Sequence, residues 1–265
     1  MFKTRLLSGI LLVIIAFATI FFGGDVLFAT LLIISLIGMS ELYKVMKVEK
    51  KLPGFAGYLA CIIYYFLLRF QRKDDIMMLA ILFLVVLMAV YVFSFPAFKS
   101  EQIVTVFFGF FYVAVMLSYI YQTRLLADGL FLVGLVFLCS WGCDTCAYCV
   151  GVLFGKHKMA PKLSPKKSIE GGIGGLAGAA LLGALYALAI NKWGNASAEP
   201  AYYALICFVG GMISMVGDLA ASAIKRNHEI KDYGKLIPGH GGILDRFDSV
   251  IFTAPVIYFL AVGLL

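Results

Sequence analysis

The sequence predicts an all-α polytopic membrane protein with about nine transmembrane helices and a cytoplasmic N-terminus. Apolar residues make up 62% of the 265-residue chain and charged residues only 14%, a balance far from that of soluble globular domains. The apolar residues also gather into runs close to the length that a bilayer requires, about 20 residues per helix. The connections between these runs are mostly too short for a soluble domain, so we expect one transmembrane domain over 1–265.

Nine apolar runs follow one another along the chain, and the third and the last are the shortest. The first run follows Lys3 and Arg5, as the core of a signal peptide would. No small-residue cleavage site follows it, so we interpret it as a retained helix. The expected helices are 6–23, 26–43, 54–69, 76–98, 102–123, 129–155, 171–191, 201–224 and 249–265.

The distribution of basic residues predicts the orientation of these helices. With the N-terminus in the cytoplasm, 17 of the 22 Lys and Arg residues fall on the cytoplasmic side. The charged connections 156–170 and 225–248 are both on that side. The net charge of +7 largely restates this bias, and it also favours contact with anionic membrane lipids.

The densest group of charges is residues 222–248, which we call the signature segment. It holds three Lys, two Arg, two His and four acidic residues between two apolar runs. A charge at the centre of a membrane helix costs about 2.5–3.5 kcal/mol, so such a cluster beside the bilayer indicates a reaction site. Cations suit phosphate, carboxylates suit a hard divalent metal, and glycines allow close approach of the backbone. The segment therefore predicts a membrane enzyme that acts on phosphates.

Two carboxylates interrupt the last four long apolar runs, Asp144 in the sixth and Asp218 in the eighth. Intramembrane acids usually serve function, although each could simply bond to a neighbouring helix. Ser222 and Lys225 lie four and seven residues after Asp218, so a helix places them on the same face, with Arg226 alongside. This stripe resembles a metal site with phosphate-binding groups above it. Snorkelling of the two cations to the headgroups is the alternative, but it leaves the acid unexplained.

The end of the signature segment carries a second pair of acids. Asp245 and Asp248 are three residues apart, so they share a face if the last helix begins here. Acids at a helix N-terminus are also favoured by the helix dipole alone. The glycine run before them, which includes Gly241 and Gly242, leaves backbone N–H groups room to meet an anion.

The connection 156–171 is basic and leads into the seventh apolar run. Ser168 suits the N-cap of that helix, and Lys166 and Lys167 would attract phosphate to its N-terminus, although the orientation rule alone would supply some lysines here. The glycine-rich stretch 171–178 contains two overlapping GxxxG spacings, which favour close helix packing.

Four cysteines between Cys139 and Cys149 have spacings that invite a metal interpretation. All four fall on one helix, and one helix cannot surround a tetrahedral ion. We therefore expect them to pack as small apolar residues.

The signature segment resembles the phosphatidate cytidylyltransferase family, also called the CDP-diacylglycerol synthases. The family pattern begins S-x-apolar-K-R and ends P-x-H-G-G-apolar-x-D-R-apolar-D, and the segment fills each fixed position. A second block from Asp144 to Gly171 is also similar to the family, and so is Gly217-Asp218-Leu219. The specific resemblance covers about 142–248, and the short N-terminus is similar to that of bacterial members. The matching residues of the segment are Ser222, Lys225, Arg226, Lys231, Asp232, Gly234, Pro238, His240, Gly241, Gly242, Asp245, Arg246 and Asp248.

The resemblance implies that CTP and phosphatidate react to CDP-diacylglycerol and pyrophosphate in phospholipid biosynthesis. It implies a bacterial cytoplasmic membrane, an active site that faces the cytoplasm, and no nucleic-acid partner. Residues 129–265 would carry the site, whereas the role of the helices in 1–125 and a homodimer are left open. A lateral mouth near headgroup depth would admit phosphatidate, and a basic mouth would admit CTP from the cytoplasm.

The resemblance also implies roles for particular residues. We expect Mg²⁺ with Asp218 and Asp245 as its principal ligands and Asp144 and Asp248 as further ones; a second metal or a monovalent cation stays open. The catalytic residues would be Asp218, Asp245, Lys225 and Asp248. The residues expected to bind substrate are Ser222, Arg226, Arg246, His240, Gly241, Gly242, Lys166, Lys167, Ser168, Lys231 and Asp232.

Two other functions fit some of these features. A CTP-dependent polyprenol or dolichol kinase would combine many spans with cytidine nucleotides but would release CDP. An ion-coupled transporter could use Asp144 and Asp218 as coupling carboxylates. No internal inverted repeat is visible, and the charged glycine-rich segment has no evident part in transport.

Overall fold

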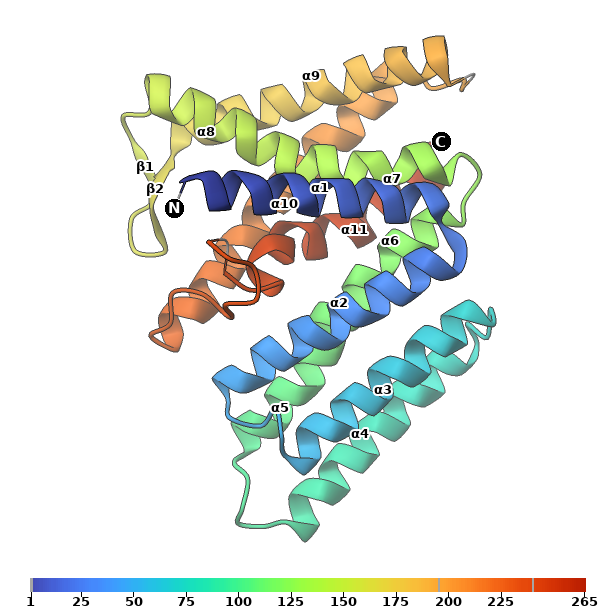
Figure 1. The fold of residues 1–265 in the computed structure, drawn as a ribbon, viewed down its shortest axis with the longest axis vertical. Coiled ribbons are helices and arrows are strands. Elements are labelled where there is room, and N and C mark those ends of the chain that lie inside the picture. The colour runs from blue at the N-terminus through green and yellow to red at the C-terminus, as the bar shows by residue number, and fades with distance from the viewer. Residues whose placement is uncertain (1, 195, 240) are drawn as a thin grey trace. The chain divides into compact units, whose positions relative to one another are not determined.

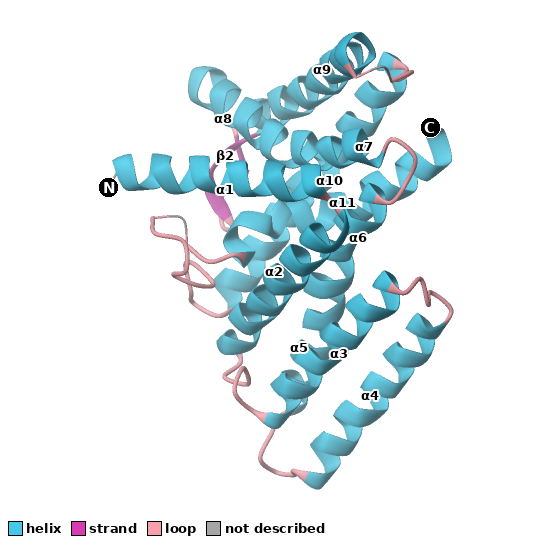
Figure 2. Ribbon diagram, turned by 45° about the vertical axis from the view of Figure 1, so that its right-hand side comes forward, coloured by secondary structure: helices cyan, strands magenta, loops and turns pink. Residues whose placement is uncertain are grey.

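The computed structural model describes residues 2–194, 196–239 and 241–265. Helices dominate the described residues, and the strands in them form one short hairpin (Figure 2). Eight helical stretches in this part of the chain are long and apolar enough to cross a membrane. These findings confirm the expectation of an all-α polytopic membrane protein.

The helices match the nine apolar runs closely, and Figure 1 shows their order along the chain. Two of the runs are each made of two α-helices joined by a short π-helical segment, named η1 and η2. The first run coincides with α1. The helical elements are α1 (Phe2–Phe22), α2 (Gly24–Val45), α3 (Leu52–Arg69), α4 (Asp75–Phe93), α5 (Ser100–Gly109), η1 (Phe110–Val115), α6 (Met116–Arg124), α7 (Gly129–Phe137), η2 (Leu138–Gly142), α8 (Cys143–Phe154), α9 (Ile169–Trp193), α10 (Pro200–Asn227) and α11 (Leu244–Leu264).

The chain divides into two compact units. The first unit contains the chain up to Tyr121 together with Asp232–Arg246, and the second contains Gln122–Lys231 and Phe247–Leu265. The signature segment is therefore shared between the units. Its first part ends α10 in the second unit, and its glycine-rich part belongs to the first. The expectation of one catalytic domain stays a prediction.

In the first unit, buried polar groups of α2, α3, α5 and the start of α6 bond to one another. The hydroxyls of Ser35 and Tyr65 lie 2.8 Å apart, and those of Tyr64 and Ser118 lie 2.9 Å apart. The Tyr43 hydroxyl donates to the Val106 carbonyl at 2.8 Å. Since hydrocarbon offers no water to such groups, this pairing lets polar side chains sit inside the bundle.

In the second unit α9 packs closely on α8 through its glycines, and the two helices run side by side in Figure 1. A Cβ at Gly175 would lie 2.9 Å from the Ala147 Cβ and 3.0 Å from the Cys143 carbonyl oxygen. One at Gly178 would lie 2.6 Å from the Cys146 Sγ. This contact confirms the packing role predicted for the GxxxG spacings.

Cys139 of η2 and Cys143 of α8 face α10. A Cβ at Gly210 of α10 would lie 2.6 Å from the Cys139 Sγ, and the Cys143 thiol donates to the Gly211 carbonyl at 3.9 Å. Both cysteines are fully buried, whereas Cys149 is exposed. Cys139 and Cys143 thus have the packing role that the sequence analysis expected.

The basic connection before α9 forms a structure that the sequence analysis did not foresee. Strands β1 (Lys158–Ala160) and β2 (Ser164–Ser168) pair antiparallel, with Lys158 opposite Ser168. We call residues 158–168 the lysine hairpin. Its base is closed by the Glu170 carboxylate, which accepts bonds from the backbone N–H groups of Lys156 and His157 at 3.1 and 3.2 Å. The hairpin therefore leaves α8 and enters α9 at a defined place.

Candidate functional site

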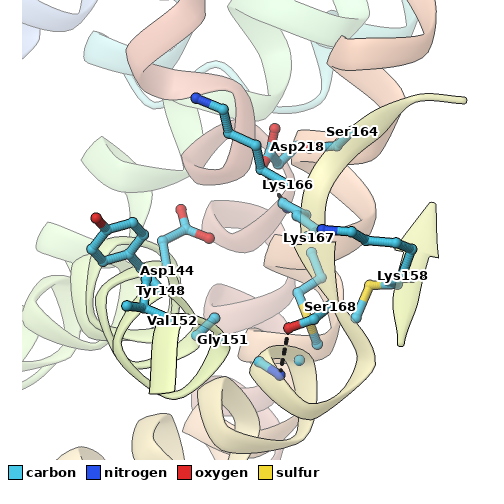
Figure 3. Close-up of a pocket in the computed structure, with 15 residues that line it drawn as sticks. Asp144, Tyr148, Gly151, Val152, Lys158, Ser164, Lys166, Lys167, Ser168 and Asp218 are labelled. Carbon is cyan, nitrogen blue, oxygen red and sulfur yellow. Dashed lines mark hydrogen bonds and ion pairs between the residues drawn. The ribbon is translucent and has the colours of Figure 1, made fainter. Parts of the chain in front are cut away.

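A cavity of about 660 Å³ opens between α8, the lysine hairpin and two further helices, α9 and α10, all within the second unit (Figure 3). It combines carboxylates, lysines, two serines of β2 and apolar side chains. The residues that line it are Asp144, Ala147, Tyr148, Gly151, Val152, Lys158, Met159, Ser164, Lys166, Lys167, Ser168, Gly171, Gly172, Met215 and Asp218. Both predicted intramembrane acids and three predicted substrate-binding residues thus share one cavity.

The ion pair between Lys167 and Asp218 joins two segments that are distant in the sequence. Lys167 comes from β2 and Asp218 from the middle of α10, and their side chains are 24% and 26% exposed. Lys166, the neighbour of Lys167 on the strand, is exposed. A partly exposed ion pair can exchange partners when a charged ligand enters, which is a useful property in a phosphate site.

Asp144 reaches the same cavity from α8. It lies in the first turn of that helix, directly after the π-helical segment η2. Figure 3 shows its carboxylate directed into the cavity, on the opposite wall from Asp218, Lys166 and Lys167. The cavity therefore holds two carboxylates that come from different helices.

The predicted stripe on α10 is present. The Ser222 hydroxyl donates to the Asp218 Oδ1 at 3.5 Å, as the four-residue spacing predicts. Lys225 is half-buried and Arg226 is exposed in the last turn, before α10 ends at Asn227. The acid, hydroxyl and cations thus follow one another toward the end of the helix.

Asp248 lies on α11 where that helix crosses α10. A Cβ at Gly217 would lie 2.9 Å from the Asp248 carbonyl oxygen, so the two backbones approach closely beside Asp218. The Asp248 Oδ1 accepts a bond from the N–H of Ser249 at 2.8 Å. The glycine before Asp218 is therefore required by the close contact between the helices.

At the end of the lysine hairpin, Ser168 caps α9 as expected. Its hydroxyl accepts a bond from the Gly171 N–H at 3.1 Å. Ser168 is buried, and a Cβ at Gly155 would lie 2.6 Å from its hydroxyl oxygen. Its observed contacts are those of a helix cap that also lines the cavity.

The remaining predicted residues belong to residues 232–243, which we call the glycine loop, or lie beside it. The Asp245 Oδ2 accepts bonds from the N–H groups of Tyr233 and Gly242, at 2.8 and 3.0 Å, and Asp245 is only 7% exposed. Gly241 has a φ of 85°, in the left-handed region that favours glycine. Lys231, Asp232 and Arg246 are exposed. His240 lies outside the described residues.

The glycine loop also contacts a carboxylate that the sequence analysis did not select. Glu41 of α2 accepts bonds from the N–H groups of Ile243 and Leu244 at 3.0 and 2.8 Å. A signal for it existed, because Glu41 is an acid inside the second apolar run, where charge is unfavourable.

Within the described residues, no group of three or more His, Cys, Asp or Glu side chains is arranged to hold a metal ion. Asp144 and Asp218 supply two carboxylates to the cavity, and hard divalent cations such as Mg²⁺ prefer oxygen ligands. Mg²⁺ commonly uses only one or two protein carboxylates and completes its shell with water and phosphate. The donor chemistry of the cavity thus fits Mg²⁺, and the predicted four-residue ligand set stays a prediction.

The chain is similar to known proteins over its full length. A model of the cytidylyltransferase family matches residues 3–263. A phosphatidate cytidylyltransferase of Bacillus subtilis is 34% identical over 269 residues, which cover 97% of each chain. One of Staphylococcus haemolyticus is 33% identical over 274 residues, 98% of this chain and 99% of the relative. One of Synechocystis is 42% identical over 137 residues, 52% of this chain and 45% of the relative.

Proposed function

The chain belongs to the cytidylyltransferase family, and from this premise we propose that it is a phosphatidate cytidylyltransferase. A phosphate oxygen of phosphatidate would attack the α-phosphorus of CTP, forming a new P–O bond. The bond between the α-phosphorus and the bridging oxygen to the β-phosphate would break, which yields CDP-diacylglycerol and pyrophosphate. Beyond the names of the relatives, the observation that supports this proposal is the cavity, in which Asp144 and Asp218 lie together with three lysines, Lys158, Lys166 and Lys167.

This reaction needs electrostatics and alignment more than proton transfer. The attacking phosphate oxygen is already anionic near neutral pH, so no strong general base is required. Two anions must instead be held in line, and the charge that develops on pyrophosphate must be neutralised. Lys167 and Lys166 offer these cations on one wall of the cavity, and Lys225 and Arg226 follow on α10.

The ion pair between Lys167 and Asp218 suits a site that binds and releases a negatively charged substrate. The Asp218 carboxylate pairs with the Lys167 ammonium group, whose Nζ atom is buried and would be costly to leave unpaired. An entering phosphate can take over the lysine, because it offers the same charge and more acceptor atoms. We propose that this exchange admits the substrate to the cavity.

Mg²⁺ is part of the proposal. Asp144 and Asp218 would hold it, and when bound it would neutralise charge on the substrate phosphates. The predicted role of Asp245 as a principal ligand beside Asp218, that of Asp248 as a further ligand, and a second metal or monovalent cation remain expectations from the resemblance.

The lining of the cavity also supports a lipid substrate. Tyr148 and Val152 are 73% and 67% exposed on α8, beside the polar residues of the cavity, and Met159 and Met215 add apolar surface. Acyl chains forced through water would cost about 0.8 kcal/mol per exposed CH₂ group. We propose that phosphatidate enters beside α8 with its chains in the bilayer. The predicted cytoplasmic orientation in the bacterial inner membrane agrees with the location of CTP.

The test is an assay of the purified protein in detergent with CTP, phosphatidate and Mg²⁺. We expect CDP-diacylglycerol and pyrophosphate in equal amounts, and loss of both without Mg²⁺. Release of CDP with a phosphorylated lipid alcohol would instead identify the kinase reaction. Absence of any turnover, together with ion-driven uptake in proteoliposomes, would favour a transporter.

A further inference from the structure

Glu41 is a buried carboxylate far in sequence from the signature segment. It lies near the end of α2 and is 8% exposed. Its two oxygens bond separately to two backbone N–H groups, Oε1 to Ile243 at 3.0 Å and Oε2 to Leu244 at 2.8 Å. Leu244 is the first residue of α11, whose initial N–H groups have no partner within the helix. Glu41 thus caps α11 from another helix, with the charge that the helix dipole favours.

The same carboxylate occupies the space beside two glycines of the glycine loop. A Cβ at Gly242 would collide with the Glu41 carboxylate, including its Oε2 at 2.5 Å. A Cβ at Gly234 would collide with Oε1 of the same group. The φ angles of both glycines lie outside the left-handed region, so space rather than backbone conformation requires glycine here. Two of the three glycines of the motif, Gly234 and Gly242, are therefore explained by a residue outside the motif.

Further contacts within the first unit hold the loop in one shape. The Ser8 hydroxyl of α1 donates to the Pro238 carbonyl at 3.2 Å. The Ile237 N–H donates to the Gly241 carbonyl at 2.9 Å and closes the turn. Asp245 accepts bonds from the N–H groups of Tyr233 and Gly242. Of these anchors, Glu41 holds the junction where the loop becomes α11.

We propose that Glu41 is a positioning residue of the cytidylyl transfer, which rests on the proposed function. Its carboxylate fixes the backbone of 242–244 and thereby the direction in which Asp245 and Arg246 leave the start of α11. Glu41 itself acts through this backbone and not on the substrate. The proposal gives the N-terminal helices, whose role the sequence analysis left open, a defined part in the reaction.

The first test replaces Glu41 by Gln, with Glu101→Gln as the matched control on the exposed first turn of α5. Because each Glu41 oxygen accepts a different N–H, the Gln amide must turn a donor toward one of them. We expect kcat to fall about 10- to 100-fold with smaller changes in KM for both substrates, since misplacement costs mainly transition-state contacts. Hydrogen exchange should rise in 233–244, while the thermal midpoint stays near that of the wild type.

Each result of this test bears on a separate claim. Wild-type kcat in Glu41→Gln would overturn the positioning role. Unchanged exchange in 233–244 would overturn the anchor itself. The wild-type protein is assayed before any variant. If it forms no CDP-diacylglycerol, the proposed function is overturned, and with it the link between Glu41 and catalysis.

A second test uses the steric contact and does not depend on the Gln variant. Glu41→Ala, Gly242→Ala and the double variant are compared in the same assay and exchange experiment. If the carboxylate fills the space of the missing Cβ, Gly242→Ala should be strongly harmful alone and add little to Glu41→Ala. Losses that multiply as independent effects would overturn the contact. If Glu41→Ala fails to fold, Glu41→Asp, which vacates part of the same space, takes its place in the cycle.

Discussion

Acidic residues have different bonding partners in the cavity of the second unit and beside the glycine loop of the first unit. In the cavity, Asp218 meets the side chains of Lys167 and Ser222 and is about a quarter exposed. Beside the glycine loop, Glu41 of α2 and Asp245 of α11 are almost completely buried and accept bonds from backbone N–H groups of the loop and of the start of α11. A side-chain cation can leave a carboxylate for an entering phosphate, whereas a backbone N–H cannot leave without unfolding the turn. We infer that the cavity acids handle ligands and the loop acids maintain shape.

The largest effect should follow from Asp218→Asn. The variant loses the charge opposite Lys167 and a predicted Mg²⁺ ligand, so we expect turnover to fall about 10²-fold or more. The protein should remain folded in detergent, and hydrogen exchange in 233–244 should stay as in the wild type. Near-normal turnover would remove Asp218 from the site.

The second-largest effect should come from an acid beside the glycine loop. Asp245→Ala leaves the buried N–H groups of Tyr233 and Gly242 without their acceptor. We expect about 10- to 100-fold lower kcat together with faster exchange at these two amides. Lost turnover with unchanged exchange would instead show that Asp245 acts on the metal or substrate, and the distinction between the two regions would fail.

A smaller effect should separate the neighbouring lysines of β2. Lys167→Ala removes the partner of Asp218, whereas Lys166 is exposed at the cavity. We expect kcat/KM for CTP to fall about tenfold or more for Lys167→Ala and less for Lys166→Ala. Lys192→Ala, at the other end of α9, is the control. Equal losses for both lysines would mean that the ion pair has no special role.

The smallest effect on turnover should come from a substitution in the packing of α9 on α8, which changes mainly the stability of the protein. In Gly175→Ala the new Cβ would press on Ala147 and the Cys143 carbonyl, which we expect to cost about 1–3 kcal/mol of stability. Gly263→Ala is the control, because nothing lies within 4 Å of its Cβ. Thermal unfolding in detergent measures the difference. A midpoint equal to that of the control would show that the α8–α9 contact can relax.

Features that depend on local spacing could be predicted from the sequence. The apolar runs located the helices, because a bilayer demands a long segment whose backbone bonds internally. The period of the helix placed Ser222 beside Asp218, and the GxxxG spacings indicated the close approach of α9 to α8. The motif identified the chemistry, although it did not assign a task to each acid.

Only the tertiary structure decided which acid meets which partner. Lys167 pairs with Asp218 because the connection before α9 forms a hairpin. The lysines and prolines of this connection did not predict a hairpin. Glu41 bonds to Ile243 and Leu244 across about 200 residues, and Asp245 turns inward to the loop backbone. Such pairings depend on how helices pack, and packing is a property of the folded chain rather than of any local pattern. The sequence by itself therefore determined the spans and indicated candidate reactive groups, and the tertiary structure decided which of these acids line the cavity and which bond to the backbone.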